Sequence, residues 1–404
     1  MITIIKYEHD RLSIGEEGFK KSQWDSFVKL NQLNEGKYFT VEHKGLRFSQ
    51  YVGVIQVDGF TVEIHPKADK NDDDANWRGV LIQMLKACGK VKVNTYADAH
   101  LNQQNLNLLE IYFDQYLLEV ETLLRTGLVK KYNREEGNVK ALKGKLDFAK
   151  NIRHNLVHKE RFYTVHQVYN VDHKLHQILA QALQIVSQFS SAMWIADRCK
   201  RVQLHFPEVK TITADKQLLD SIQLNRKTEG YERALELARL IILNYSPNIA
   251  SGNEKMISIL FDMNQLWEEY MLKMLKKSAP ANFEVLGKRR LPFWGSNRLE
   301  PDIVLKKRIE NDATETFIID TKWKTPGKQT SIQDLRQLYA YARFWKSTKV
   351  MLLYPGRSQE SEVNEFEDEL FEGRVTCYKT FVSVLKDENV LDDGVGDFVV
   401  NLIH

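Results

Sequence analysis

The chain has 404 residues, of which 43% are hydrophobic and 27% charged, a composition typical of a globular protein with two or three domains. Its net charge of +3 is too small to indicate nucleic-acid binding by itself, so any basic surface must be local. Three widely spaced cysteines argue against a disulfide framework, and we see neither an apolar run of bilayer length nor a signal-peptide pattern, so we expect a cytoplasmic protein without membrane contact.

Residues 1–95 are predicted to form a strand-rich N-terminal domain. Short runs with apolar and β-branched residues recur in ITIIKY and YFTVEHKGLRFSQ. The strongest hairpin signal of the chain is YVGVIQVDGFTVEIHP, with Asp58-Gly59 at the turn. An acidic loop then leads to a helix that begins near Trp77. This domain is a candidate for docking a partner or for contacting DNA, and both alternatives remain open.

Residues 96–250 are predicted to be a mainly helical middle region, because apolar residues recur at helical spacing in LLEIYFDQYLLEVETLLRTGL and ERALELARLIILNY. The region contains a basic segment around a turn at Gly144. Such a segment can neutralise DNA phosphates, meet an acidic partner surface, or simply be solvated. The candidate contact residues of this segment are Lys143, Lys145, Lys150 and Arg153.

Histidines are dense in the same region. His154 and His158 have i,i+4 spacing, and His173 and His176 have i,i+3 spacing, both of which occur in zinc sites. No cysteine or acidic signature accompanies these histidines, so the sequence argues against a zinc site.

Residues 251–404 are predicted to form a third domain, which follows a linker at residues 246–255. Its first element is a helix, because FDMNQLWEEYMLKMLKK places apolar residues at helical spacing. Glu268 lies on the flank of this helix next to Phe261 and Leu275, where a carboxylate is half-buried. It is either a ligand of a metal ion or a boundary glutamate that reaches water.

Two carboxylates lie at the ends of apolar runs in this third domain. Asp302 follows a proline at the start of one predicted strand, and Asp320 ends another, with Lys322 two residues later. Because side chains alternate along a strand, Asp320 and Lys322 project on the same side. Two carboxylates from neighbouring strands suit Mg²⁺, and a lysine beside them can hold water near the metal. The pattern predicts a metal-dependent phosphodiesterase, with a solvated salt-bridge cluster as the alternative.

The predicted elements around these residues agree with that interpretation. They are a helix, strands near 283–288, 299–306 and 315–323, a helix at 331–346 and a strand at 349–354. This αβββαβ order is the core of the restriction-endonuclease-like fold, so we predict a multidomain α/β protein that ends in such a domain. Gln337 and Tyr341 lie one turn apart on the second helix and can face one cleft.

The C-terminal part of the chain resembles PD-(D/E)xK nucleases, and the chain as a whole resembles the McrC family, the nuclease subunit of McrBC-type modification-dependent restriction systems. The resemblance covers about residues 140–355. It rests on the segment from Gly144 to Leu179, which begins GKLDFAK, and on LWEEYML, PDIVL, IIDTKWK and LRQLYAYA, which occur in the order typical of that family.

The resemblance implies a role for each candidate residue. Asp302, Asp320 and the backbone carbonyl of Thr321, helped by Glu268, would hold Mg²⁺ or Mn²⁺. Lys322 would position the attacking water, while Gln337 and Tyr341 would orient the phosphate or the lysine, with Tyr341 also a candidate contact to DNA or a partner.

The family's motor is a separate GTP-hydrolysing AAA+ hexamer, McrB. The resemblance therefore implies an McrB-like partner, double-stranded DNA with methylcytosine-type modification as the substrate, and stimulation of the motor's GTP hydrolysis. No phosphate-binding P-loop occurs, since GNVKALKGKL has the wrong spacing, so we expect this chain to bind no nucleotide itself. A stand-alone repair or structure-specific nuclease, and a non-catalytic adaptor that only stimulates the motor, are the alternatives.

Overall fold

The computed structural model describes residues 2–57, 59–67, 77–91, 107–247, 255–309, 314–324, 330–356, 358–367, 374–387, 390–392 and 394–403. Over these residues the chain is a mixed α/β protein with several sheets. It divides into two compact units, one with residues 55–59 and 100–259 and the other with residues 2–54, 60–99 and 260–404. The three domains predicted from the sequence, with boundaries at residues 95 and 250, stay a prediction.

The N-terminal strands form most of one five-stranded sheet, whose order is β1-β6-β5-β11-β10. β1 (Ile2–Tyr7) lies parallel to β6 (Phe60–His65). β6 is buried along its whole length, and β5 (Tyr51–Val57) is buried beyond its first residue. These two neighbouring strands confirm the predicted strand pair, although Asp58 of its turn lies outside the described residues. The other elements here are β2 (Arg11–Ser13), η1 (Glu16–Gly18), α1 (Lys21–Leu33), β3 (Phe39–Glu42), β4 (Gly45–Phe48) and α2 (Trp77–Ala87).

The middle of the chain contains the predicted helices. α4 (Leu108–Thr126) packs against α7 (Met193–His205) and α9 (Glu232–Leu243). It begins at a capping box, in which Asn107 and Glu110 each accept a hydrogen bond from the other's backbone N–H. The other helices of this region are α6 (Lys174–Phe189), α8 (Lys216–Asp220) and η2 (Glu229–Tyr231).

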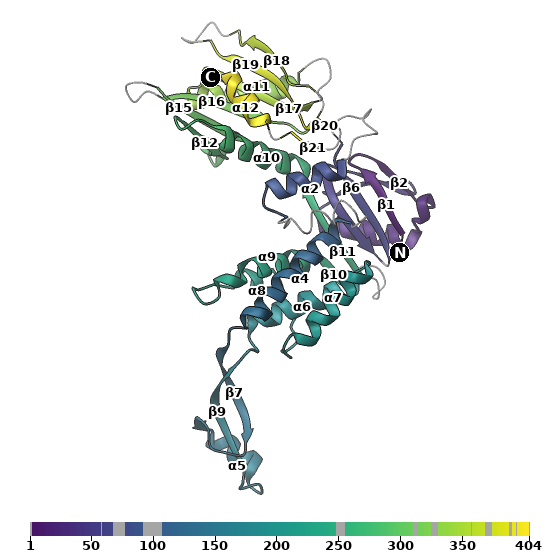
Figure 1. Cartoon of the computed structure of the whole chain (residues 1–404), viewed down its shortest axis with the longest axis vertical. Helices are drawn as coiled ribbons and strands as arrows, with labels where there is room; N and C mark the ends of the chain where they lie inside the picture. Colours follow the sequence, from purple (N-terminus) through teal and green to yellow (C-terminus); the bar gives the residue numbers. More distant parts are fainter. Residues whose placement is uncertain are drawn as a thin grey trace. The chain divides into compact units, whose positions relative to one another are not determined.

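A two-stranded ribbon interrupts these helices. β7 (Lys131–Val139) pairs antiparallel with β9 (Phe162–Asn170), and the ribbon extends away from the helices of its unit (Figure 1). β8 (Lys145–Leu146) and α5 (Phe148–Asn155) form its far end. Between residues 131 and 170 the chain therefore departs from the predicted mainly helical region, with three strands and one short helix. Aromatic and β-branched residues in β9 favour an extended strand, and pairing with β7 satisfies its backbone.

The C-terminal residues form a six-stranded mixed sheet of order β12-β15-β16-β17-β19-β18, in which β15 is antiparallel and β17 parallel to β16. The predicted elements are present. They are α10 (Met263–Ser278), β12 (Phe283–Gly287), β15 (Ile303–Arg308), β16 (Thr314–Thr321), α11 (Ile332–Trp345) and β17 (Lys349–Gly356). A hairpin that was not predicted from the sequence lies between β12 and β15 and is formed by β13 (Leu291–Trp294) and β14 (Asn297–Leu299). The remaining elements are β18 (Glu360–Glu365), β19 (Thr376–Ser383), β20 (Leu385–Asp387), β21 (Val390–Leu391) and α12 (Val395–Ile403).

Helix α11 packs on the sheet through Leu338 and Ala342, which contact a buried cluster that includes Ile318, Val350 and Leu352. This packing brings Gln337, which precedes Leu338, to the end of β16, where it lies within reach of Lys322. Among the described residues, no helix combines the length and the apolar character needed to cross a bilayer.

Both ends of the predicted linker at residues 246–255 belong to paired strands. β10 (Tyr245–Pro247) and β11 (Lys255–Asp262) pair antiparallel, with Tyr245 opposite Ile257. Residues 248–254, between the two strands, lie outside the described residues. The polar and glycine-containing composition that suggested a linker is equally typical of the connection between two paired strands.

Candidate active site

Asp302 and Asp320 lie at the same end of two neighbouring strands. The antiparallel register of β15 and β16 pairs Ile303 with Ile319, which places Asp302, one residue before β15, opposite Asp320. Asp320 is 1% exposed. The backbone N–H and the hydroxyl of Thr321 both donate to Oδ2 of Asp302, at 2.7 and 2.9 Å. The chain therefore fixes the Asp302 carboxylate from the neighbouring strand.

Lys322 completes this group. Its Nζ lies 2.7 Å from Oδ2 of Asp320 and 3.5 Å from Oε1 of Gln337. Burial by itself lowers the pKa of the Lys322 ammonium, but Asp320 and Asp302 oppose this effect and leave the pKa above its ordinary value. Lys322 is thus a cation at neutral pH, suited to holding an anion or a water molecule rather than to removing a proton.

The second turn of α11 holds the other side of the site. Gln337 Nε2 donates to the hydroxyl of Tyr341 at 2.7 Å, and that hydroxyl donates to the backbone carbonyl of Glu300 at 3.1 Å. Tyr341 is 4% exposed. The structure therefore does not place Tyr341 as a surface contact to DNA or a partner. It places Tyr341 as a buried support for Gln337 and for the segment that precedes Asp302.

The surroundings of both aspartates disfavour the charged form of the carboxyl group. Burial raises the pKa of the Asp302 carboxyl above its ordinary value. Burial and the nearby charge of Asp302 together raise the pKa of Asp320 to about 6, against the opposing effect of Lys322. Two neighbouring carboxylates of this kind, one buried and one partly buried, accept a hard cation readily, because the cation offsets their desolvation and the repulsion between them.

Glu268 borders the site but is engaged by a lysine. Its Oε1 lies 3.3 Å from Nζ of Lys288, and burial, with the charge of Asp302, raises the pKa of the Glu268 carboxyl to about 7. Within the described part of the chain, no three carboxylate, imidazole or thiol groups converge closely enough to hold a metal ion together. The structure thus brings the two aspartates together but does not add Glu268 to a closed ligand set. A two-carboxylate site still fits Mg²⁺, which keeps several water ligands.

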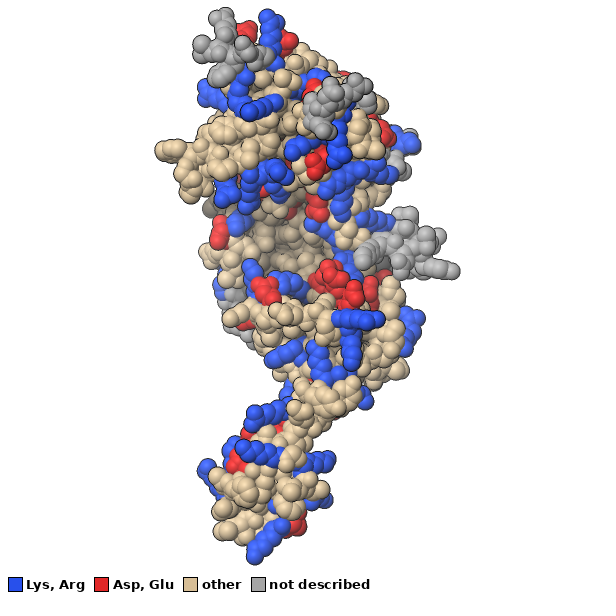
Figure 2. Space-filling model, turned by 90° about the vertical axis from the view of Figure 1, so that its left-hand side faces the viewer, with Lys and Arg blue, Asp and Glu red and all other residues tan. Residues whose placement is uncertain are grey.

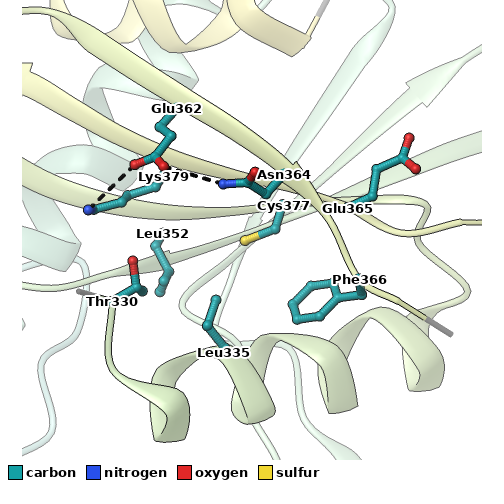
Figure 3. Close-up of a pocket in the computed structure, with 9 residues that line it drawn as sticks. All are labelled: Thr330, Leu335, Leu352, Glu362, Asn364, Glu365, Phe366, Cys377 and Lys379. Atoms are coloured by element: carbon teal, nitrogen blue, oxygen red, sulfur yellow. Dashed lines mark hydrogen bonds and ion pairs between the residues drawn. The ribbon is translucent and has the colours of Figure 1, made fainter. Parts of the chain in front are cut away.

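A pocket of about 150 Å³ lies beyond Leu352, the neighbour of Asp320 on β17. Cys377, Glu362, Lys379 and other residues line it (Figure 3). Lys379, the lysine among its described lining residues, lies 3.6 Å from Glu362, and burial raises the pKa of the Cys377 thiol to about 11. The described lining residues therefore offer neither a free cation for a phosphate nor a reactive thiolate.

The predicted basic segment belongs to the other unit, where it forms part of the β7–β9 ribbon. Lys143, Lys145, Lys150 and Arg153 are all exposed. Residues 131–170 contain nine Lys and Arg against four Asp and Glu, a net +5 that exceeds the +3 of the whole chain. Figure 2 shows basic side chains along this ribbon, at the lower end of the view, with few acidic ones. Lys150 nevertheless forms an ion pair with Glu136.

The histidines of the middle region have structural partners. The ring of His173 lies 2.8 Å from the carbonyl of Val129, and His176 contacts the carbonyl of Val171 and the hydroxyl of Tyr231. Burial lowers the pKa of His176 to about 4, so this residue is neutral. These contacts join the two ends of the ribbon to the helices.

One residue pair that was not predicted from the sequence supports the site. The indole N–H of Trp323, next to Lys322, donates to the carboxylate of Glu8 at 2.6 Å. The Trp323 ring also packs on Trp267, the neighbour of Glu268, with ring centroids 5.4 Å apart. A tryptophan directly after the lysine of the motif was the available signal, but nothing local points to Glu8.

The sequence matches the family described as McrBC 5-methylcytosine restriction system component, over residues 46–355. The chain belongs to this family. Two solved structures from Thermococcus gammatolerans share its fold. One is an assembly of McrB AAA+ hexamers with bound McrC, at 20% identity, a TM-score of 0.73 and full coverage of both chains. The other is an McrBC complex, at 21% identity and a TM-score of 0.53, covering 69% of this chain and 88% of that chain. No curated protein matches the chain.

Proposed function

We propose that this chain is the DNA endonuclease subunit of a GTP-dependent restriction complex that acts on DNA with modified cytosine. The observation that carries the proposal is the group of Asp302, Asp320 and Lys322 at one strand end, in which Asp320 is buried, the other two are partly buried and the lysine stays cationic. The order α10-β12-β15-β16-α11-β17 supports a restriction-endonuclease-like domain around this group. Fold alone would not carry this function, because one fold hosts many activities.

The residues of the site have distinct tasks in phosphodiester hydrolysis. Mg²⁺ or Mn²⁺, held by Asp302, Asp320 and the carbonyl of Thr321, would neutralise phosphate charge and lower the pKa of a bound water. Thr321 keeps the Asp302 carboxylate oriented through its N–H and hydroxyl. Lys322 holds the attacking water or a phosphate oxygen beside the carboxylates. Gln337 limits the movement of the lysine and is itself fixed by Tyr341.

We propose an McrB-like AAA+ GTPase hexamer as the partner that this chain stimulates. Membership of the McrBC family supports this, as do the two similar structures, which contain McrB together with McrC. The absence of a P-loop motif from the sequence implies that GTP is bound by the partner. A nuclease without its own means of reading sequence is best kept inactive until it is assembled on DNA, which favours cleavage gated by the motor.

The test is cleavage of cytosine-methylated and unmethylated plasmids in Mg²⁺, with and without the AAA+ partner and GTP. Asp320→Asn and Lys322→Ala should each slow cleavage by about a hundredfold or more, because each removes charge that the transition state requires. Glu315→Gln, at the opposite end of β16, is the matched control and should cut normally.

The possible results separate the alternatives. Cleavage that needs methylation, partner and GTP supports the restriction subunit. Equal cleavage of both plasmids without the partner would instead support a stand-alone nuclease. If neither wild type nor the variants cut DNA, while all stimulate GTP hydrolysis equally, the chain is an adaptor and the proposal is wrong.

A further inference from the structure

A cationic and aromatic segment directly precedes the first aspartate of the site. Residues 288–298 contain four cations, no acid, and two adjacent aromatic residues, Phe293 and Trp294. They include the hairpin β13–β14, in which Pro292 lies opposite Arg298 and Trp294 opposite Asn297. Gly295 begins the turn with φ +58°, which a glycine adopts without strain.

The side chains at the tip of the hairpin are exposed. Trp294 is 78% exposed and Phe293 is 50% exposed, and Arg289, which precedes β13, and Arg298, within β14, are exposed as well. An indole is seldom left this accessible to water, because it is the largest apolar side chain that a protein can bury. Together with the adjacent Phe293 it forms an exposed aromatic pair, which is typical of a surface that binds a ligand.

The hairpin is nonetheless held in place. Its inner residues Leu291 and Leu299 are opposite each other, and Leu299 packs against the apolar cluster beneath α11. The ring of Phe293 meets the ring of Phe344 on α11, with centroids 5.3 Å apart. At the base of the hairpin, Arg290 forms an ion pair of 2.6 Å with Glu300. These contacts limit the movement of the hairpin, which lowers the entropy cost of binding through it.

Both ends of the hairpin are tied to the site. The N–H of Lys288, before β13, donates to the carbonyl of Asp302 at 3.0 Å. The carbonyl of Glu300, after β14, accepts from the hydroxyl of Tyr341. A molecule bound by the hairpin is therefore held at a fixed position relative to Asp302.

We propose that the β13–β14 hairpin binds duplex DNA, with Arg289 and Arg298 on backbone phosphates and the Trp294 ring against a base or sugar. This inference rests on the proposed nuclease function and identifies the surface that would deliver the scissile phosphate. Charge complementarity selects DNA, because a segment with four cations and no acid suits a polyanion. Lys288 and Arg290 are held by Glu268 and Glu300, which leaves the two other arginines as the phosphate ligands.

The experiment measures binding of a short fluorescein-labelled, cytosine-methylated duplex by the full chain, alone and with its AAA+ partner and GTP. All proteins carry Asp320→Asn, so that the DNA stays intact. Trp294→Ala should weaken binding about tenfold or more, because the contact of the ring with the base or sugar is lost, and Trp294→Phe should retain most of the affinity. Arg298→Ala should reduce the slope of log affinity against log salt by about 1.

Two matched controls test the specificity of these effects. Trp194→Ala removes another exposed tryptophan, which lies on α7, and Arg374→Ala removes an exposed arginine near β19. Both should bind DNA like the parent protein. Stimulation of the partner's GTP hydrolysis should be the same in all hairpin variants, which also verifies that they are folded.

Three results would overturn the inference. The first is unchanged DNA affinity in Trp294→Ala and Arg298→Ala. The second is a hairpin variant that no longer binds the AAA+ partner but still binds DNA. The third is a hairpin variant that no longer associates with a second copy of this chain but still binds DNA. The nuclease proposal is judged separately, by cleavage with Asp320 restored. If the wild-type chain binds DNA through the hairpin but never cleaves it, the nuclease proposal alone is wrong. If the hairpin substitutions leave DNA cleavage unchanged, this inference alone is wrong.

Discussion

Asp320 is a residue at which function and stability oppose each other. Its carboxylate is buried next to Asp302, and its pKa is raised to about 6, so the charged form is disfavoured in the folded protein without a cation. We predict that Asp320→Asn raises the free energy of unfolding of the metal-free protein by about 1 kcal/mol while it abolishes cleavage. The gain is small because the substitution also weakens the contact with Lys322.

Thermal unfolding with and without Mg²⁺ measures this effect. Mg²⁺ should raise the unfolding temperature of wild type at pH 8, where the carboxylates are charged, and should have little effect on Asp320→Asn. Glu315→Gln, in the same strand, should respond like wild type. An equal response of Asp320→Asn and wild type to Mg²⁺ would contradict the assignment of Asp320 as a ligand.

The sequence predicted which side chains lie together along one strand, but not which side chains meet between different strands and helices. The alternation of side chains places Asp320 and Lys322 together whatever the rest of the fold does. The orientation of Asp302 by Thr321, in contrast, depends on the register of β15 against β16. The burial of Tyr341 depends on how α11 packs, which a helical repeat alone does not specify.

At the level of elements, the ribbon depends on one glycine. Gly144 has φ +64°, and a Cβ there would lie 2.4 Å from the carbonyl oxygen of Val165 on β9. We predict that Gly144→Ala destabilises the far end of the ribbon by about 1–3 kcal/mol, because it combines a strained backbone with a clash. Hydrogen exchange should then accelerate in β8, α5 and the adjoining half of β9, while the helices α4 and α6 stay protected.

Gly137 offers the matched control for this prediction. It lies within β7, and a Cβ there would meet nothing within 4 Å. Gly137→Ala should therefore leave exchange in the ribbon unchanged or slightly slower. If hydrogen exchange in the ribbon were as slow in Gly144→Ala as in Gly137→Ala, the turn would not require a glycine.

Elements whose apolar residues recur with a regular period were predicted well, and paired strands without such a period were missed. The helices α4, α9 and α10 carry apolar residues at helical spacing. β7 reads KYNREEGNV, with no apolar alternation, and it is a strand because β9 pairs with it. The β13–β14 hairpin is short, and its exposed Phe293 and Trp294 resemble core residues in composition.

At the scale of the whole chain, segments distant in sequence contribute to one compact unit. Residues 2–54 and 260–404 belong to the same unit, and Glu8 reaches Trp323 within it. Glu8 also accepts from the N–H of Lys67 at 2.8 Å and lies near the charge of Asp262, which caps α10. A contact across more than 300 residues has no signal in a single sequence, so the sequence could not link the first strand to the site.

Glu8 should make stability fall as pH rises. Burial raises the pKa of its carboxyl to about 7, so between about pH 4.5 and 7 the folded chain holds a proton that the unfolded chain releases. Glu8→Gln should therefore add about 2 kcal/mol of stability at pH 8 and little at pH 4.5. Unfolding by denaturant at both pH values measures the difference, and Lys6→Met, in the same strand, is the control that should not remove this pH dependence.

Because the amide oxygen still accepts from Trp323, Glu8→Gln should keep Lys322 positioned and cleave DNA normally, whereas Glu8→Leu should cleave about tenfold more slowly. Equal cleavage by Glu8→Leu and Glu8→Gln would show that the first strand does not position the site.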